Sequence, residues 1–383
     1  MLAQQRHAYV LERLSAQGAV RVTEVVAMLG VSDGTVRRDL EILEQQGLLM
    51  RVRGGAVPTT AATAPISSAP LTAESAQRPP GTASRGGAMI GMLVPSTTYY
   101  YPEVIRGAQE SAARAGARLV LGVTDYGGDR DLDQLRALIR SGSDGLLVTP
   151  AVGPVITEPV RDLVEGCGVP YVLVERRSAA TFDHAEYVLS DHRQGAYRAV
   201  EHLARLGHRG VALFAHFTPT TKPVVEGHAA AVQRLGLDAS APVMAPEDGT
   251  DRLAAIDAFA DACRDCGATA ALVHSDQEAI LLVQRLRTRE VRIPEDLAVI
   301  AYDDEVAAFA QVPLTAVAPP KYEVGRAAAT ALLARIGVAG DPPIRQTVLL
   351  PKLVVRTSCG AALRARDAET GSMTAARLPV ATP

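Results

Sequence analysis

Short apolar runs alternate with amphipathic helical stretches through most of this chain, and that alternation limits the fold more than any other feature. Helical stretches include residues 101–116 and 191–207. Continuous apolar strands between helices predict a parallel sheet covered on both faces. The strand-like runs are residues 88–94, 117–123, 145–150, 170–175, 210–215, 270–275 and 297–304.

This body is long enough for more than one sheet. Residues 89–360 exceed what a single doubly wound sheet needs, so we expect an α/β fold with two lobes. Ligands of such folds bind outside the carboxyl ends of the strands, in the crevice between lobes. The sequence therefore places a binding site between the lobes.

Two segments of different composition frame the body. Residues 58–88 contain five prolines and otherwise mostly Ala, Ser and Thr, which predicts a flexible linker. Residues 361–383 are also small, polar and tipped with proline, which predicts a disordered tail. Residues 1–57 then form a separate head.

Composition indicates a soluble cytoplasmic protein. Hydrophobic residues make up 48% of the 383 residues, charged residues 21%, and the net charge is −3. Met1 leads into a polar helix rather than a signal peptide, and no apolar run reaches about 18 residues. Cys263 and Cys266 form a CxxC pair in a helical segment, with no partners for a zinc site. We expect reduced cysteines, no metal and no cofactor.

The head has the pattern of three short helices followed by a hairpin. The first helix stops at Gly18, the second spans residues 23–30, and Ser32 is a natural N-cap for the third. Two short strands after Gly47, joined by Gly54 and Gly55, resemble a wing. Helix, tight turn and helix form a helix-turn-helix, so we expect a winged DNA-binding domain.

Positive charge in the head is local. The head has seven arginines and six acidic residues, and four of the arginines lie in the third helix and the wing. Buried positions at helical spacing (Val36, Leu40 and Leu43) would leave the opposite face free for DNA. We expect base contacts from Ser32, Thr35 and Arg38, and phosphate contacts from Arg37, Arg51 and Arg53. The alternative is a solvated helix stabilised only by Arg–Asp pairs.

Two family resemblances add to these interpretations. "VSDGTVRRDLEILEQQGLLMRVRGGAV" resembles the winged helix-turn-helix of DeoR-family bacterial repressors, over about residues 4–57. The body resembles the effector domain of LacI/GalR regulators, over about residues 89–360, in blocks such as "SDGLLVTP", "IPEDLAVIAYDDE" and "LLPKLVVRTSCG". The combination implies a hybrid, with a DeoR-type head on a periplasmic-binding-protein-like sensor.

The second resemblance implies where an effector would bind. Carboxylates suit a polyol because their oxygens accept hydrogen bonds from hydroxyl groups. One departure is Val224, where the family commonly has Arg; Lys222 and Lys321 could instead indicate an acidic or phosphorylated effector. The candidate effector residues are Ser96, Tyr99, Tyr100, Glu175, Lys222, Asp276, Asp303 and Lys321.

We therefore expect a transcriptional regulator, and a repressor in particular. Two heads on a homodimer would bind an inverted-repeat operator in double-stranded DNA, with a sugar-like molecule as effector. The linker would span about 30 Å, close to the ~34 Å between half-sites one turn apart. The alternative is an enzyme or ligand-binding protein with an accessory DNA-binding head, but the sequence has no recognisable catalytic motif.

Overall fold

The computed structural model describes most of the body and parts of the head. It divides the chain into two units, Met1–Arg78 and Pro79–Pro383, which are considered separately below. The predicted linker up to residue 86, most of the predicted tail and Arg53 lie outside the described residues. The described residues are 6–7, 10, 13, 20–29, 31–45, 50–52, 55–57, 87–178, 184–338, 340 and 342–362.

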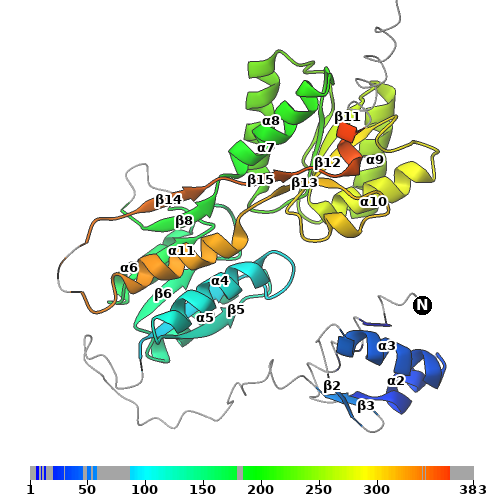
Figure 1. Cartoon of the computed structure of the whole chain (residues 1–383). Helices are drawn as coiled ribbons and strands as arrows, with labels where there is room; N and C mark the ends of the chain where they lie inside the picture. The colour runs from blue at the N-terminus through cyan, green and yellow to red at the C-terminus, as the bar shows by residue number, and fades with distance from the viewer. Residues whose placement is uncertain are drawn as a thin grey trace, which may run out of the picture. The chain divides into compact units, whose positions relative to one another are not determined.

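The head contains a helix pair and a small sheet (Figure 1). α2 (Val22–Leu29) and α3 (Asp33–Gln45) are the predicted second and third helices, within two residues of the expected bounds. The sheet has the order β1-β3-β2, and all of its pairs are antiparallel. Its strands are β1 (Val20–Arg21), β2 (Met50–Val52) and β3 (Gly55–Val57). β2 and β3 form the predicted wing hairpin.

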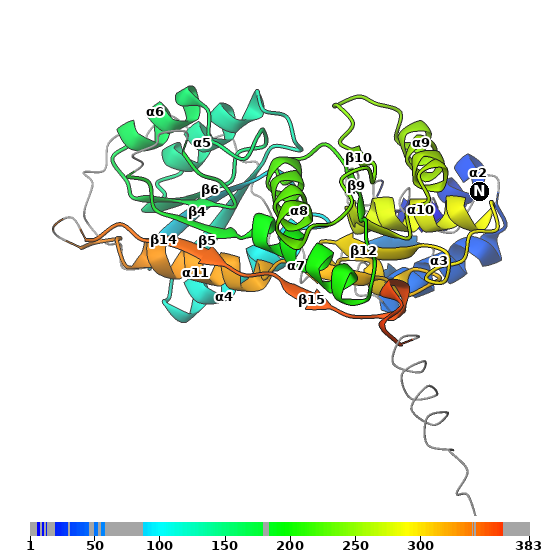
Figure 2. The same ribbon diagram turned by 90° about the horizontal axis from the view of Figure 1, so that it is seen from above.

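Lobe 1 of the body is built on a six-stranded parallel sheet in the order β14-β8-β7-β6-β4-β5. α4 (Tyr101–Arg114) and α11 (Lys321–Leu333) cover one face, and α5 (Arg130–Arg140) and α6 (Glu158–Gly166) cover the other (Figure 2). The strands are β4 (Met89–Val94), β5 (Arg118–Val123), β6 (Gly145–Val148), β7 (Tyr171–Val174), β8 (Tyr187–Ser190) and β14 (Gln346–Leu349).

Lobe 2 repeats this plan in the order β10-β9-β11-β12-β13-β15, with only β15 antiparallel. α7 (His192–Arg205) and α8 (Thr221–Leu235) cover one face, and α9 (Arg252–Asp265) and α10 (Asp276–Arg287) cover the other. The strands are β9 (Ala212–Ala215), β10 (Val243–Met244), β11 (Ala270–His274), β12 (Ala298–Tyr302), β13 (Thr315–Ala318) and β15 (Lys352–Val354).

The chain passes between the lobes three times. It crosses from β8 to α7, returns from β13 to α11, and crosses again from β14 to β15 (Figure 1). Each lobe is therefore assembled from separate stretches of the chain. The expected two-lobed α/β fold is confirmed, and the seven predicted strands are β4, β5, β6, β7, β9, β11 and β12.

Glycines set the closest helix contact in lobe 1. A Cβ atom on Gly325 of α11 would lie 1.8 Å from the carbonyl oxygen of Val104 in α4, and one on Gly107 would lie 2.0 Å from the carbonyl oxygen of Tyr322. The two helices thus pack backbone against backbone, which no larger residue allows. Because α11 follows the second crossing, this contact fixes lobe 1 to the chain that returns from lobe 2.

Substituting Gly325 with Ala should lower the free energy of unfolding of the body by about 1–3 kcal/mol, since α4 and α11 must move apart to admit the methyl group. Gly166→Ala is the matched control, because no atom lies within 4 Å of a Cβ built there. Urea denaturation followed by circular dichroism measures both variants. Equal midpoints for the two variants would contradict the close packing of α4 on α11.

Candidate nucleic-acid interface and ligand cleft

α3 of the head presents one buried and one exposed face. Val36, Leu40 and Leu43 are at most 1% exposed, which confirms the predicted buried stripe, while Arg38 is exposed. The backbone N–H of Thr35 donates to Ser32 Oγ at 3.2 Å, so Ser32 caps the helix as predicted. The start of α3 therefore presents polar side chains next to Arg38.

The remaining predicted DNA contacts are only partly described. Thr35 is half-buried, and its hydroxyl lies 2.8 Å from that of Ser32. Arg37 lies in α3 and Arg51 in β2, the first strand of the wing. The side chains of Arg37 and Arg51, and all of Arg53, lie outside the described part of the chain.

Asp39 anchors α3 to the residues that precede β1. Its buried carboxylate accepts hydrogen bonds from Arg6 Nε at 2.6 Å and Nη2 at 3.0 Å, and it lies 3.0 Å from His7 Nε2. Burial opposes ionisation of Asp39, but the bonds from Arg6 and His7 lower its pKa below the usual value. This anchor holds α3 against the rest of the head, and the sequence analysis did not identify it.

Most non-glycine residues of the body with a left-handed backbone conformation lie at the carboxyl ends of the strands. Among the described residues, seven non-glycine residues have φ in the left-handed region, and only Glu290 lies away from these ends. Non-glycine residues adopt this region at a cost, and such residues cluster at functional sites. The other six are Tyr99, Asp125, Tyr126, Glu175, Asp303 and Asp304. This is the edge at which the sequence analysis expected the ligand.

Tyr99 joins the two lobes at this edge. It lies between β4 and α4 of lobe 1, and its hydroxyl is 2.5 Å from Asp276 Oδ1 and 3.2 Å from Asp303 Oδ2, both in lobe 2. Burial first, and then the neighbouring carboxylates, raise the pKa of the Tyr99 hydroxyl well above its usual value. It therefore remains a hydrogen-bond donor.

Asp276 also holds the loop after β12. Its Oδ2 atom accepts hydrogen bonds from the backbone N–H groups of Glu305 (2.7 Å), Val306 (2.6 Å) and Ala307 (3.1 Å). Asp276 is completely buried, so these bonds compensate for the removal of its charge from water. The carboxylate of Asp303, which precedes this loop, has no such set of backbone donors among the described contacts.

Glu175 is the centre of a polar network in lobe 1. Its carboxylate accepts bonds from the Tyr100 hydroxyl at 2.8 Å and from the Ser190 backbone N–H at 2.9 Å and hydroxyl at 2.8 Å. His192 Nε2 lies 3.6 Å away. Burial opposes ionisation of Glu175, but the interaction with His192 and these donors lower its pKa to about 2. Glu175 is therefore a fixed negative charge at neutral pH.

His192 links this network to lobe 2. It begins α7 at the first crossing, its Nδ1 atom lies 3.3 Å from the Tyr302 hydroxyl, and that hydroxyl donates to the His192 carbonyl at 3.0 Å. Since the single hydroxyl proton of Tyr302 is used in that bond, Nδ1 is left as the donor to the Tyr302 oxygen. The sequence analysis did not identify this connection.

The two candidate lysines occupy different environments. Lys321 is buried at the start of α11, where its ammonium donates to the backbone carbonyl of Asp303 and pairs with Glu305. Lys222 is exposed in the first turn of α8. Ser96 is buried, and its hydroxyl accepts from the Thr98 backbone N–H at 3.0 Å. Thus Lys321 is engaged by protein groups, and Ser96 shapes the turn that leads to Tyr99.

Two further buried groups in this region were not predicted. The Arg176 side chain donates from Nε to the Pro150 carbonyl and from Nη1 to the Glu175 carbonyl, and Nη2 has no protein partner in the described part of the chain. His274 is 2% exposed, and its Nε2 atom lies 3.9 Å from Asp303 Oδ2. Burial lowers the pKa of His274 to about 3, so it is neutral and leaves Asp303 without a charged partner there. The only sequence feature that could have indicated Arg176 is the "ERR" motif at residues 175–177, which starts with Glu175.

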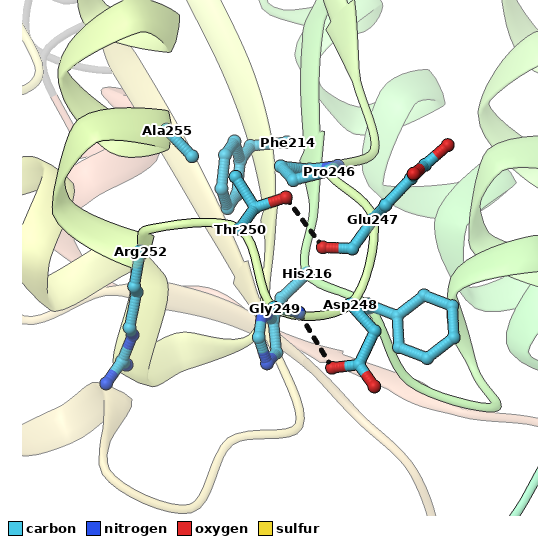
Figure 3. Close-up of a pocket in the computed structure, with 10 residues that line it drawn as sticks. Phe214, His216, Pro246, Glu247, Asp248, Gly249, Thr250, Arg252 and Ala255 are labelled. Carbon is cyan, nitrogen blue, oxygen red and sulfur yellow. Dashed lines mark hydrogen bonds between the residues drawn. The ribbon is translucent and has the colours of Figure 1, made fainter.

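A small cavity lies beside this edge in lobe 2 (Figure 3). Its volume is about 30 Å³, which holds a water molecule but not a sugar. Arg252, at its rim, donates to Glu278 Oε1 at 2.7 Å. Its walls include Phe214, His216, Pro246, Glu247, Asp248, Gly249, Thr250 and Ala255. A cavity of about 310 Å³ lies where β7 and β8 begin, at the opposite edge of the lobe 1 sheet. Neither cavity encloses the carboxylates that meet at Tyr99.

Family models match both parts of the chain. Residues 6–61 match the DeoR-like helix-turn-helix domain, and residues 200–359 match the periplasmic binding protein-like domain. The solved structure of a LacI-family regulatory protein from Chloroflexus aggregans superimposes with a TM-score of 0.62 at 25% identity, covering 70% of this chain and 98% of that one.

Curated relatives agree with these models. The arabinose metabolism transcriptional repressor of Geobacillus stearothermophilus is 25% identical over 88% of this chain and 89% of its own length. The transcriptional repressor PurR of Vibrio cholerae is 30% identical over 64% of this chain and 74% of its own length. The chain belongs to the LacI family of transcriptional regulators. Its head is DeoR-like, so this LacI-family regulator is the hybrid that the sequence indicated.

Membrane-spanning helices and metal-ligand clusters were sought in the described part of this LacI-family regulator. The described part of the chain has no helix that is long and apolar enough to cross a membrane. Within the same residues, no three His, Cys, Asp or Glu side chains are grouped as metal ligands. The relatives reported above are transcriptional regulators rather than enzymes.

Asp276→Ala should lower the free energy of unfolding of the regulator's body by about 3 kcal/mol, because three backbone N–H groups lose their acceptor. Gln277→Ala, at the exposed next position of α10, is the matched control and should change it by less than about 0.5 kcal/mol. Urea denaturation measures both variants. A body as stable in Asp276→Ala as in the control would contradict the anchoring role of Asp276.

Proposed function

We propose that this LacI-family regulator is a repressor whose operator binding is controlled by a small polyhydroxylated effector held between lobes 1 and 2. The observation that carries the proposal lies at the carboxyl ends of both sheets, where Asp276 and Asp303 of lobe 2 meet Tyr99 of lobe 1 and the next residue, Tyr100, donates to Glu175. Buried carboxylates accept hydrogen bonds, and a polyol supplies the donors.

The head would read DNA with the first turns of α3. In this proposal Ser32, Thr35 and Arg38 contact base edges in the major groove, and Arg37 contacts a phosphate. Arg51 and Arg53 of the wing add phosphate contacts. The exposure of Ser32 and Arg38, opposite the buried stripe of α3, supports the base contacts.

The charges at the cleft favour a neutral effector over a phosphorylated one. Glu175 is ionised, His274 is neutral, and Lys321, whose charge acts on Asp303, is paired with Glu305. An added anion would therefore be repelled by the Glu175 carboxylate. Arg176 Nη2, buried and without a protein partner among the described residues, is available to a ligand hydroxyl. The name of the Geobacillus relative, an arabinose metabolism repressor, supports a sugar.

The protein would act as a homodimer in the cytoplasm. Two heads on one dimer bind an inverted-repeat operator more tightly than one head because the second contact is intramolecular. We propose the boundaries 1–57 for the head, 58–88 for a linker, 89–360 for the effector-binding and dimerisation domain, and 361–383 for a tail. In this scheme the acidic side chains hold the ligand and perform no catalytic step.

Arg38→Ala should weaken discrimination between operator and unrelated DNA by about 1–3 kcal/mol, since a side chain that contacts base edges is lost. Arg37→Ala should weaken binding to all sequences about equally and reduce the slope of log affinity against log salt by about one. Fluorescence polarisation with the promoter DNA upstream of its own gene, at two salt concentrations, measures both effects.

The matched control for these variants is Arg136→Ala, an exposed arginine of the body. Its affinity and salt dependence should equal those of the unmodified protein. Retention of full operator preference by Arg38→Ala would refute its contact with bases.

A titration with neutral sugars and their phosphate esters tests the effector. One neutral sugar should change the polarisation signal of the protein–DNA complex, and Asp303→Asn should weaken that response at least about tenfold, since hydrogen bonds to a charged acceptor are the stronger kind. A response confined to phosphate esters would reject the neutral effector.

A further inference from the structure

The Tyr99 side chain directly joins the ligand edges of the two lobes described above. Its hydroxyl leaves lobe 1 and lies 2.5 Å from Asp276 Oδ1 and 3.2 Å from Asp303 Oδ2 of lobe 2. A phenol carries one proton and can donate one strong hydrogen bond. Two carboxylates, both almost completely buried, therefore share a single donor.

We infer that Tyr99 is a built-in substitute for the ligand: its hydroxyl occupies the donor position between Asp276 and Asp303 and holds the lobes together until the effector displaces it. This inference rests on the proposed function of the cleft as the effector site. It adds that the ligand-free protein is already partly closed and that the effector competes with a side chain of the protein itself.

The backbone around Tyr99 supports this role. Tyr99 has φ of 58°, in the left-handed region that a bulky residue adopts only when its surroundings impose it. The preceding turn is fixed by Ser96, whose hydroxyl accepts from the Thr98 backbone N–H and lies 2.9 Å from the Thr98 hydroxyl. The turn and the bonds to lobe 2 together keep Tyr99 in this conformation, so displacement of the hydroxyl removes one of the two constraints on it.

The number of free acceptors at the site indicates which ligands can replace the Tyr99 hydroxyl. Asp276 Oδ2 is already satisfied by three backbone N–H groups, so Oδ1 and the Asp303 carboxylate are the acceptors that face the tyrosine. One phenol proton serves both. Two adjacent hydroxyl groups of a ligand would give each carboxylate its own donor, whereas a phosphate or carboxylate would bring only acceptors. The site therefore favours a ligand with vicinal hydroxyl groups.

Two further connections between the lobes are independent of the Tyr99 hydroxyl. Lys321, at the start of α11 in lobe 1, donates to the Asp303 carbonyl and pairs with Glu305, both in lobe 2. His192 contacts Glu175 in lobe 1 and Tyr302 in lobe 2, and Tyr100 of lobe 1 donates to Glu175 without reaching lobe 2. Removal of the Tyr99 hydroxyl should therefore loosen the closed arrangement without separating the lobes or unfolding either one.

Hydrogen–deuterium exchange of the full chain, without ligand or DNA, tests the inference. Tyr99→Phe keeps the ring and removes the donor. We expect exchange about fivefold faster in peptides covering residues 97–104, which contain Tyr99, and 303–309, which contain Asp303 and the loop held by Asp276. This is the change expected for the loss of one hydrogen bond. Tyr187→Phe is the matched control, because that half-buried tyrosine lies in the same lobe at the start of β8, the end of the strand opposite the ligand edge.

Each outcome decides the matter. Faster exchange confined to the two cleft peptides supports the inference. Unchanged exchange overturns it, and so does equally faster exchange in the buried strands β4 and β11, which would indicate general destabilisation. Because no sugar is present, this result does not depend on the effector titration: a protein that responds to a sugar but shows unchanged exchange in Tyr99→Phe would keep the proposed function and lose the built-in substitute.

Discussion

The buried carboxylate of Asp276 is the interaction on which the rest of the ligand edge depends. It begins α10, and its two oxygens accept the backbone N–H groups of residues 305–307 and the hydroxyl of Tyr99. One side chain thus fixes the start of a helix, the loop after β12 and the approach of the opposite lobe. The complete burial of the Asp276 carboxylate is tolerated because three backbone N–H groups and one hydroxyl group donate to it. Asp303, at the beginning of the same loop, is positioned by this arrangement and keeps capacity for a ligand.

Most of the fold of the body could be predicted because its two sheets are parallel except for β15. Parallel strands covered on two faces must be apolar throughout, so runs such as residues 145–150 and 270–275 are visible in the sequence without further information. The strands that were not predicted are those at edges and crossings, such as β10, β14 and β15. They are short or partly exposed, and their residues satisfy no strong periodic pattern.

The ligand edge was predictable only in part. Aspartates and a glutamate directly after apolar strands could be expected at a carboxyl edge, and Glu175, Asp276 and Asp303 do lie there. Which acceptor meets which donor depends on how the two lobes close, and no local pattern encodes that. Lys321 illustrates the difference: its charge indicated an anionic ligand, but the fold brings it to Glu305. The ion pair between Asp39 and Arg6 in the head is likewise set by the fold and not by any local sequence pattern.

The three crossings between the lobes have a consequence for how the protein is made. Lobe 1 lacks α11 and β14 until residue 349 has been synthesised, and lobe 2 lacks β15 until residue 354. Neither sheet is complete before nearly the whole body has left the ribosome, so the two halves of the sensor mature together rather than in sequence. The helices and strands of the head end at residue 57 and need none of that chain. During synthesis the regulator therefore has a complete DNA-binding head well before its effector domain is complete. Premature termination of translation would yield DNA-binding heads that no effector can regulate.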